Sequence, residues 1–503
     1  MKKNRPNIIL IILDSARKDF FGCYGNSENL TPNIDALAEK GLMLCNCYAG
    51  GCGSSQAHVS IFTGQHSERH KMAHNLCDVK KDLITLPLLL KKLGYKTFGY
   101  TKFDIVPPAG HEKLFGFDEL VYPEKKEKIV SRKKSMRDKF LQGARRIIKI
   151  PPVLKKLINK IFTKIINEHL ILRTRANTFD GKTSLDYLFG KLEENKSKGP
   201  VFAYTTLLHP HTPYYPPREF LDKIFQDKRI HEGSYDIQLD VHAYANGNFG
   251  KAEEAMESVR KCYKADLLYA DHLIGNFVEK LKQNSLIENT LLVVMADHGE
   301  LLGEHGGINH GGALWEELLN IPCVIYYPEK IAPNSLNYNL TSATDIFPTI
   351  FDLIGEKKRA QDETVFDGIS IFEGGYDWKN RYLVVDCPPV ILPKRLKNYR
   401  NLMKRANVIS RTIRNTSYKY IWQSNGNNCL FKVGSEESPQ NNLLMQDKGL
   451  EKKFSDDMLR FYKSIEPDFK MDEYPLYLSK ETARRITNTV MRNELIKLGY
   501  LPA

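Results

Sequence analysis

PNIILIILD, residues 6–14, is the stretch that decides the fold. Its nearly continuous apolar run is rich in isoleucine, and such runs are typical of a parallel strand that is buried on both faces of a sheet. The run ends at Asp14. Because α/β folds place their chemistry at the carboxyl ends of parallel strands, Asp14 is the first candidate site residue.

Three later apolar runs repeat this pattern, in YKTFGYT (95–101), VFAYTTLL (201–208) and TLLVVMA (290–296). A helix signal lies between the run at 6–14 and the run at 95–101. It is TPNIDALAEKG (31–41), where Thr31 suits an N-cap and Gly41 a helix stop. Four strand ends that converge on one site predict a doubly wound α/β fold. The polar residues after the three later runs are Lys102, His209 with His211, and Asp297 with His298.

The 503 residues could form about three domains of roughly 150 residues, but α/β enzymes often fold as one large unit. We therefore expect one catalytic domain over 1–375. Later segments such as YKYIWQSN (418–425) and CLFKV (429–433) alternate with turn residues and predict a small antiparallel sheet. With helices expected near 452–464 and 481–498, residues 376–503 form a smaller C-terminal α+β subdomain in this interpretation.

Composition narrows the class of protein. A share of 42% hydrophobic and 26% charged residues excludes collagen-like, fibrous and disordered chains. Nine cysteines, an odd number without a CxxC pair, favour reduced thiols over a disulfide framework or a structural zinc site. The early apolar run, residues 8–13, is too short for a membrane span or a signal-peptide core, so we expect a cytoplasmic protein.

The net charge of +13 is concentrated in one segment. Residues 124–176 hold 17 of the 73 Lys and Arg residues and 4 of the 60 Asp and Glu residues, so the rest of the chain is neutral. This distribution indicates a basic insertion and argues against a nucleic-acid partner. Within it, residues 153–166 form a basic amphipathic helix pattern. Either its apolar stripe packs on its own domain, or it binds an anionic membrane surface and makes the protein peripheral there.

Several segments, taken in order, resemble the sulfatase family of the alkaline-phosphatase superfamily. They are LDSARKDFFGCYGNSENLTPNIDALAEKG (13–41), SSQAHVSIFTG (54–64), HPHTPYYPP (209–217), DHGELLGEHGGINHGGALWEELLNIPCVIYYP (297–328), TDIFPTIFDLIG (344–355) and LFKVGSEESPQNNLL (430–444). The resemblance covers most of 5–450 except the basic insertion. It implies an alkaline-phosphatase-like fold, in which helices sandwich a large, doubly wound mixed sheet, and it implies a metal-dependent hydrolase. It is less specific for the reaction, because sulfate and phosphate esters are both tetrahedral oxyanions.

The resemblance also implies a nucleophile. In the family it lies nine residues before the threonine of a Thr-Gly pair, at the start of a helix, and counting back from Thr63 gives Ser54. Sulfatases mature a Cys or Ser at this position to formylglycine, within the pattern nucleophile, any residue, Pro or Ala, any residue, Arg. Residues 54–58 read SSQAH, which lacks the Pro or Ala and the Arg, so maturation stays open. Cys52 is a rival nucleophile two residues too early.

Two further positions match the family's anion-binding residues. His58 replaces the arginine that braces the nucleophile, and Lys102 matches an anion-binding lysine. Asp104 departs from the family because a histidine usually stands there. We expect His58 and Lys102 to be part of the catalytic machinery, with a structural role as the alternative for His58.

Two histidines match positions that hold the transferred group or protonate the leaving oxygen. They are His211, in HTPY, and His310, in NHGG. Each could instead be a structural histidine. His209 is a weaker candidate, for which a turn-stabilising role beside Pro210 is the alternative.

A metal site is expected at Asp14, Ser54, Asp297 and His298. Carboxylates and imidazole at strand ends are hard or borderline ligands, and the Asp297-His298-Gly299 sequence can turn both side chains toward one cation. The family's first loop often has two consecutive acids, whereas here Ser15 follows Asp14. That loss moves the site away from an all-oxygen calcium cage. One divalent ion is expected, manganese, magnesium, calcium or zinc, with manganese or calcium favoured.

The sequence thus leads to a metal-dependent sulfatase-type hydrolase that cleaves a sulfate ester through a nucleophile at Ser54. The alternative is a phosphoester or phosphodiester hydrolase, or a phosphoryl-group transferase, with unmodified Ser54. A third hypothesis is a membrane-associated scaffold without activity. The expected partner is an anionic sulfate or phosphate ester, carbohydrate or lipid-linked in nature.

Overall fold

The computed structural model describes residues 5–72, 82–101, 115–122, 181–212, 214–225, 252–388 and 408–472. Several expectations from the sequence lie outside these ranges: the basic insertion 124–176, Lys102, Asp104 and the expected helix at 481–498. In the described residues, none of the helices is both long and apolar enough to cross a membrane.

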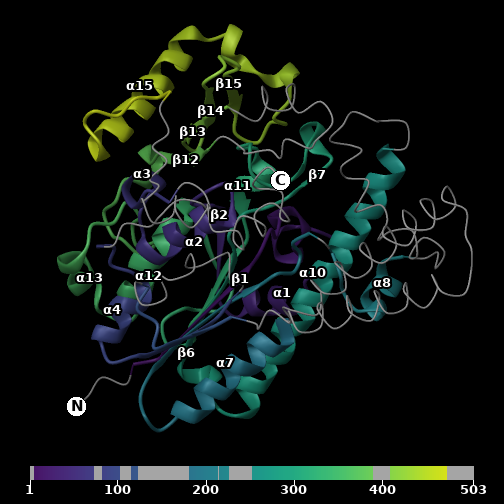
Figure 1. Cartoon of the computed structure of the whole chain (residues 1–503), viewed down its shortest axis with the longest axis vertical. Coiled ribbons are helices and arrows are strands. Elements are labelled where there is room, and N and C mark those ends of the chain that lie inside the picture. Colours follow the sequence, from purple (N-terminus) through teal and green to yellow (C-terminus); the bar gives the residue numbers. More distant parts are fainter. Residues whose placement is uncertain are drawn as a thin grey trace, which may run out of the picture.

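A mixed sheet runs through the centre of the molecule (Figure 1). Its order is β11-β2-β10-β6-β1-β5-β3-β4, with β9 paired to β2. The β1 strand pairs in parallel with β5 and β6, whereas β10 is antiparallel to both its neighbours. The strands of this sheet in the described residues are β1 (Asn7–Leu13), β2 (Leu42–Tyr48), β3 (Lys96–Tyr100), β4 (Glu119–Val121), β5 (Val201–Leu207), β6 (Thr290–Ala296), β9 (Asn320–Ile321), β10 (Cys323–Tyr326) and β11 (Ser335–Ser342).

The central strand is buried because its side chains are apolar on both faces. The side chains from Ile8 to Leu13 have no exposed surface. Burying six large aliphatic side chains stabilises the fold by roughly 1.5–3 kcal/mol each. The register places Leu13 opposite both Leu207 of β5 and Ala296 of β6. The residues that follow β1, β5 and β6 therefore meet at one edge of the sheet.

Helices cover both faces of the sheet, which confirms the predicted sandwich (Figure 1). On one face lie α1 (Pro32–Glu39), α7 (Gly181–Asn195), α8 (Arg218–Ile224) and α10 (Ala252–Gln283). On the other lie α2 (Ser54–Thr63), α4 (Leu86–Lys92), α12 (Ile346–Leu353) and α13 (Lys357–Glu363). Gly64 ends α2 with φ 65°, a left-handed conformation that glycine adopts without strain.

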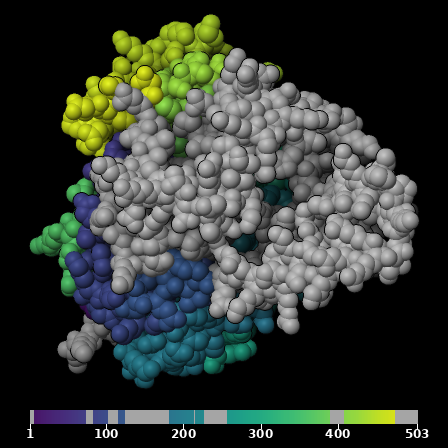
Figure 2. Space-filling view, viewed as in Figure 1, coloured from purple at the N-terminus to yellow at the C-terminus, as the bar shows by residue number. Residues whose placement is uncertain are grey.

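A smaller unit follows the large sheet. Its strands form an antiparallel sheet in chain order, β12 (Leu383–Cys387), β13 (Ser410–Arg414), β14 (Tyr418–Gln423) and β15 (Cys429–Lys432). The α15 helix (Lys448–Ile465) packs on it through Phe454, Met458 and Tyr462, which lie four residues apart on one helix face. Figure 2 shows this unit at one end of the described molecule and α7 toward the other.

Candidate active site

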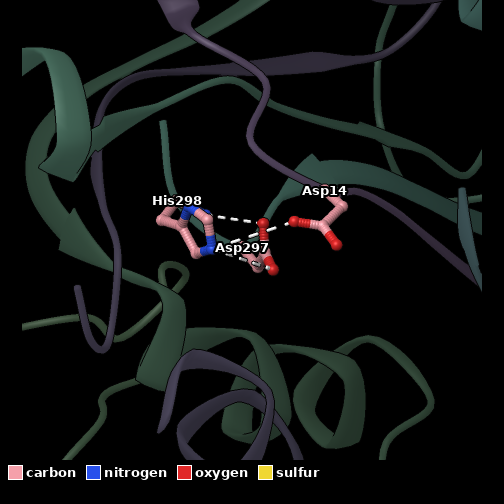
Figure 3. A group of neighbouring side chains, drawn as sticks. All are labelled: Asp14, Asp297 and His298. Atoms are coloured by element: carbon pink, nitrogen blue, oxygen red, sulfur yellow. Dashed lines mark hydrogen bonds and ion pairs between the residues drawn. The ribbon is translucent and has the colours of Figure 1, made fainter. Parts of the chain in front are cut away.

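The ends of β1 and β6 bring three buried side chains together (Figure 3). Asp14 follows β1 and Asp297 follows β6, each one residue past the paired residues Leu13 and Ala296, and His298 comes directly after Asp297. One ligand atom from each of the three side chains lies within 4.8 Å of the others. Nε2 of His298 is 3.8 Å from Oδ1 of Asp14 and 3.6 Å from Oδ2 of Asp297.

Hydrogen bonds orient the two residues after β6. Nδ1 of His298 lies 2.8 Å from the carbonyl oxygen of Gly299, so Nδ1 carries the proton and Nε2 faces the carboxylates with a lone pair. Burial, and then the charge of His310, lower the pKa of His298 to about 3 and keep its ring neutral. Oδ1 of Asp297 accepts bonds from the amides of Ser15 and His298 at 3.2 and 2.8 Å.

The second oxygen of Asp297 makes the cluster fit a metal ion. Oδ2 of Asp297 is buried and has no hydrogen-bond partner among the described residues. Burial, and next the charge of Asp14, raise the pKa of Asp297 well above its ordinary value. A divalent cation between the two carboxylates would lower the pKa of Asp297, because its positive charge offsets both the burial of this carboxylate and the repulsion from Asp14. Two carboxylates and one neutral imidazole suit manganese, magnesium, calcium or zinc.

Ser54 belongs to α2, in the helical layer that also holds α4, α12 and α13, and its side chain lies at the cluster. As the first residue of α2, it places Oγ 3.0 Å from Nε2 of His298 and 3.4 Å from Oδ1 of Asp14. The N-cap residue, Gly53, has no side chain to cap the helix. Because a helix does not use its own first N–H groups, this end of α2 suits an anion. The structure thus brings together the four residues expected at the metal site.

His58 lies one helical turn after Ser54 and has both ring nitrogens engaged. Nδ1 is 2.8 Å from the carbonyl oxygen of Ser54, and Nε2 is 3.1 Å from Oγ1 of Thr206. Its ring is fully buried, and burial lowers the pKa of His58 to about 4. His58 therefore contacts the backbone of the nucleophile as a neutral ring, which fits a bracing role better than proton transfer to substrate.

His310 and His211 line the same side of the cluster. The His310 ring lies 4.3 Å from the His298 ring and 5.0 Å from the His211 ring, between centroids. Nδ1 of His310 lies 3.4 Å from Oε2 of the buried Glu300. Burial alone would lower the pKa of His310, but the Glu300 carboxylate outweighs it and raises that pKa to about 9. His310 is therefore a cation near neutral pH.

The two weaker candidates lie beside the cluster. The Cys52 thiol is buried, and its proximity raises the pKa of the Cys387 thiol well above the ordinary value. Nδ1 of His209 lies 2.8 Å from Oδ1 of Asp266 on α10. Cys52 thus belongs to a contact with the C-terminal unit, and His209 to a contact with α10. The position of Lys102 is outside the described residues.

Sequence reasoning missed three residues that support the cluster. They are Ser15, whose φ of 66° turns its amide toward Asp297, Glu300 beside His310, and Thr206 beside His58. A pair of threonines inside the otherwise apolar run at 201–208 was a signal for Thr206, because a buried hydroxyl needs a partner. The signal for Glu300 was a further carboxylate only three residues after Asp297.

Fold and site together define a protein of the alkaline-phosphatase-like fold, with a buried Asp-Asp-His cluster at the strand ends that fits a metal ion. Residues 6–356 match the profile of the Sulfatase family, so the chain belongs to the sulfatase family. It is a sulfuric ester hydrolase, and its substrate is an anionic sulfate ester.

Named relatives support this assignment. A choline-sulfatase of Rhizobium meliloti is 25% identical over 71% of this chain and 69% of its own length. An N-acetylglucosamine-6-O-sulfatase of Bacteroides thetaiotaomicron is 25% identical, over 70% of this chain and 68% of its own.

Solved structures confirm the fold. A phosphonate monoester hydrolase of Agrobacterium radiobacter superimposes with a TM-score of 0.64 at 21% identity and covers 92% of this chain and 96% of its own. A structure in complex with its substrate D-glucosamine-2-N,6-O-disulfate gives a TM-score of 0.66 at 19% identity, over 93% of this chain and 100% of its own. At these identities the likeness concerns the fold alone.

Proposed function

We propose that the enzyme hydrolyses sulfate esters by attack of the side chain at position 54 on sulfur. The observation that carries the proposal is the position of Ser54 Oγ, 3.0 Å from Nε2 of His298 and 3.4 Å from Oδ1 of Asp14. A group with this placement can attack in line while the cluster binds the ester. In this step a bond forms between the oxygen at position 54 and sulfur, and the bond from sulfur to the leaving oxygen breaks.

Asp14, Asp297, His298 and Ser54 would hold one divalent cation. When bound, the cation supplies positive charge that favours the ionised nucleophile and stabilises the sulfuryl oxygens. Manganese or calcium is the proposed ion. Oδ2 of Asp297, which is buried without a hydrogen-bond partner among the described residues, supports a cation at this point.

Residues of the chain supply the remaining roles. The amides at the start of α2 face the anion and favour its negative charge. His310 carries a proton near neutral pH, and because its Nδ1 faces Glu300, its Nε2 is the nitrogen that can donate to the leaving oxygen. His211, 5.0 Å from His310 between ring centroids, binds the transferred group in this proposal, together with Lys102.

The proposed substrate is a sulfated carbohydrate. Support comes from the names of similar proteins, an N-acetylglucosamine-6-O-sulfatase of Bacteroides thetaiotaomicron and an ulvan-active sulfatase of Formosa agariphila. The structure solved with D-glucosamine-2-N,6-O-disulfate has the same fold. A lipid-linked sulfated sugar is the variant of this proposal that would use a membrane surface.

Cell location is also a proposal. The basic segment 124–176 would place the enzyme in the cytoplasm and at the surface of an anionic membrane. Support comes from the concentration of 17 Lys and Arg residues in that segment of an otherwise neutral chain. Each basic residue close to anionic lipid gains about 1 kcal/mol, so several of them suffice for peripheral binding.

A second candidate is hydrolysis of a phosphoester, or transfer of its phosphoryl group, by unmodified Ser54. The observation that favours it is the sequence SSQAH at 54–58, which departs from the maturation pattern at Gln56 and His58. A serine ester of phosphate can be hydrolysed or passed to an acceptor. It lacks the geminal hydroxyl by which formylglycine expels sulfate.

The mass of the proteolytic peptide that contains residue 54 separates the two candidates. The sulfatase proposal predicts an aldehyde, which is serine less two hydrogens, or its hydrate. Plain serine at full occupancy in active enzyme would instead support phosphoryl chemistry. When the protease cuts between Ser54 and Ser60, the peptide that contains Ser60 of the same helix is the internal standard.

A further inference from the structure

A chain of buried hydroxyl groups lies under the nucleophile. Thr206 and Tyr204 follow each other on one face of β5, and both side chains are fully buried. The Tyr204 hydroxyl is 2.6 Å from Oγ1 of Thr206, and Oγ1 of Thr206 is 3.1 Å from Nε2 of His58. Nδ1 of His58 is in turn 2.8 Å from the carbonyl oxygen of Ser54. These contacts link β5 to the first residue of α2.

The donor and the acceptor of each hydrogen bond can be assigned in turn, starting from the Ser54 carbonyl at one end of the series. The carbonyl oxygen of Ser54 can only accept, so Nδ1 of His58 donates to it. In a neutral ring Nε2 then has only a lone pair, and the Thr206 hydroxyl donates to it. With its own proton used, Oγ1 of Thr206 accepts from the Tyr204 hydroxyl. One orientation of the His58 ring satisfies every group in the chain.

Because residue 58 is a histidine, its ring needs a second hydrogen bond, besides the one to the Ser54 carbonyl, to fix its orientation. In the neutral ring, His58 has one donor and one acceptor. The bond from Nδ1 to Ser54 alone would let the ring turn about its axis. The bond to Nε2 from the other side of the ring prevents that rotation.

We propose that Thr206 is a positioning residue of this enzyme, which holds His58 so that Nδ1 donates to the Ser54 carbonyl and keeps Ser54 Oγ at the cluster. This inference rests on the proposed function of Ser54. Thr206 acts through His58 and touches no substrate. A misplacement of a reacting group by about 1 Å can lower a rate by roughly 100-fold, so a small shift of α2 matters.

The strand offers a matched control next to Thr206. Thr205 is also fully buried, and its hydroxyl donates a 2.9 Å bond to the carbonyl oxygen of Tyr100. The Thr206 hydroxyl instead has His58, Tyr204 and Thr101 as partners. Because neighbouring residues of a strand point to opposite faces, Thr205 points away from His58. Thr205→Val and Thr206→Val thus remove the same group from the same strand.

The first experiment measures kcat and KM of the full-length enzyme, supplied with its cation, for 4-nitrophenyl sulfate. Thr206→Val should lower kcat about tenfold with KM within about twofold, whereas Thr206→Ser, which keeps the hydroxyl, and Thr205→Val stay within about twofold of wild type. Equal kcat values for Thr205→Val and Thr206→Val would overturn the proposal. If Thr206→Val does not fold, Thr206→Ala replaces it under the same criteria.

A double-mutant cycle tests the path through His58. In His58→Asn, the side-chain amide can still donate to the Ser54 carbonyl, but it has no group at the position of Nε2. Thr206→Val should therefore lower kcat no further in the His58→Asn background. The same fold loss in both backgrounds would show that Thr206 acts independently of His58 and would overturn the proposal.

A substrate-free measurement separates this inference from the proposed function. Ring ¹⁵N shifts of His58 in the Mg²⁺-supplied protein, assigned by their loss in His58→Asn, should show a proton on Nδ1 and an accepting Nε2. Thr206→Val should shift the Nε2 signal, and Thr205→Val should leave it in place. An unchanged Nε2 signal in Thr206→Val would overturn the role of Thr206. Failure of wild type to cleave the sulfate ester would count against the proposed function only.

Discussion

Ser54 Oγ lies 3.0 Å from Nε2 of His298, although the two residues are 244 positions apart in the chain. Ser54 begins α2 in one helical layer, and His298 follows β6, which is paired with the central strand β1. The contact exists because the start of α2 and the carboxyl end of β6 meet at the same edge of the sheet. The proposed nucleophile and a proposed metal ligand are thereby placed side by side.

Replacing Ser54 tests which side chain attacks. Ser54→Ala should abolish turnover of 4-nitrophenyl sulfate and leave the circular dichroism spectrum unchanged, because Ser54 contributes chemistry and little core volume. Cys52→Ala should keep most of the activity, since the Cys52 thiol faces Cys387. Reversed results would identify Cys52 as the attacking group.

Replacing one carboxylate tests the metal site. Asp297→Asn should weaken Mn²⁺ binding by more than about tenfold in isothermal titration calorimetry, because it removes one of two negative ligands. Asp266→Asn is the matched control, since Asp266 is equally buried but pairs with His209 outside the cluster. Chelation should remove wild-type activity, and added Mn²⁺ should restore it. Wild-type affinity in Asp297→Asn would refute the site.

Stability should depend on pH through Glu316, which joins the catalytic domain to the small sheet. Burial would raise the pKa of Glu316, but Lys419 and Arg414 outweigh it and lower that pKa to about 2. The folded pKa is below the ordinary value of 4.5, so the stabilisation is present above pH 4.5 and is lost as pH falls toward about 2.

The measurement is the free energy of unfolding in urea at pH 6 and pH 3. Glu316→Gln should be less stable than wild type at pH 6, and the difference should shrink at pH 3. Asp222→Asn, on the exposed surface of α8, is the control and should track wild type at both pH values. A difference between Glu316→Gln and wild type that is independent of pH would contradict the assignment.

The basic segment predicts membrane binding that salt reverses. Full-length protein should sediment with anionic vesicles at low salt, and a variant in which a short linker replaces 124–176 should stay in solution. Neutral vesicles should leave both in solution. Equal sedimentation of both proteins with anionic vesicles, or none of either, would eliminate the segment as a membrane contact.

Much of the fold was predictable because the strongest signals in the sequence are local. The apolar run 8–13 is buried in full as the central strand β1, and the helix expected near 452–464 is present as α15. Capping was less predictable. Thr31 holds the N-cap position of α1 but makes no capping bond, and Asp271 of α10 accepts the amides of Asn33 and Ile34 instead. A cap from 238 residues away leaves no local pattern.

The ligand cluster followed from strand ends, whereas its supports depend on contacts between layers. Asp14, Asp297 and His298 could be placed because each ends an apolar run. Thr206 and Glu300 could not be assigned to His58 and His310, because those pairs form only when β5, α2 and the loop after β6 are packed together. Spacing along the chain carries no information on such pairs.

Release of inorganic sulfate tests the central claim most directly. Wild-type enzyme supplied with Mn²⁺ is incubated with glucosamine 6-sulfate and, in parallel, with glucosamine 6-phosphate, and the free anions are measured by ion chromatography. We expect sulfate release in step with desulfated sugar, none from Ser54→Ala, and little phosphate. Release of phosphate without sulfate, or undiminished sulfate release by Ser54→Ala, would contradict it.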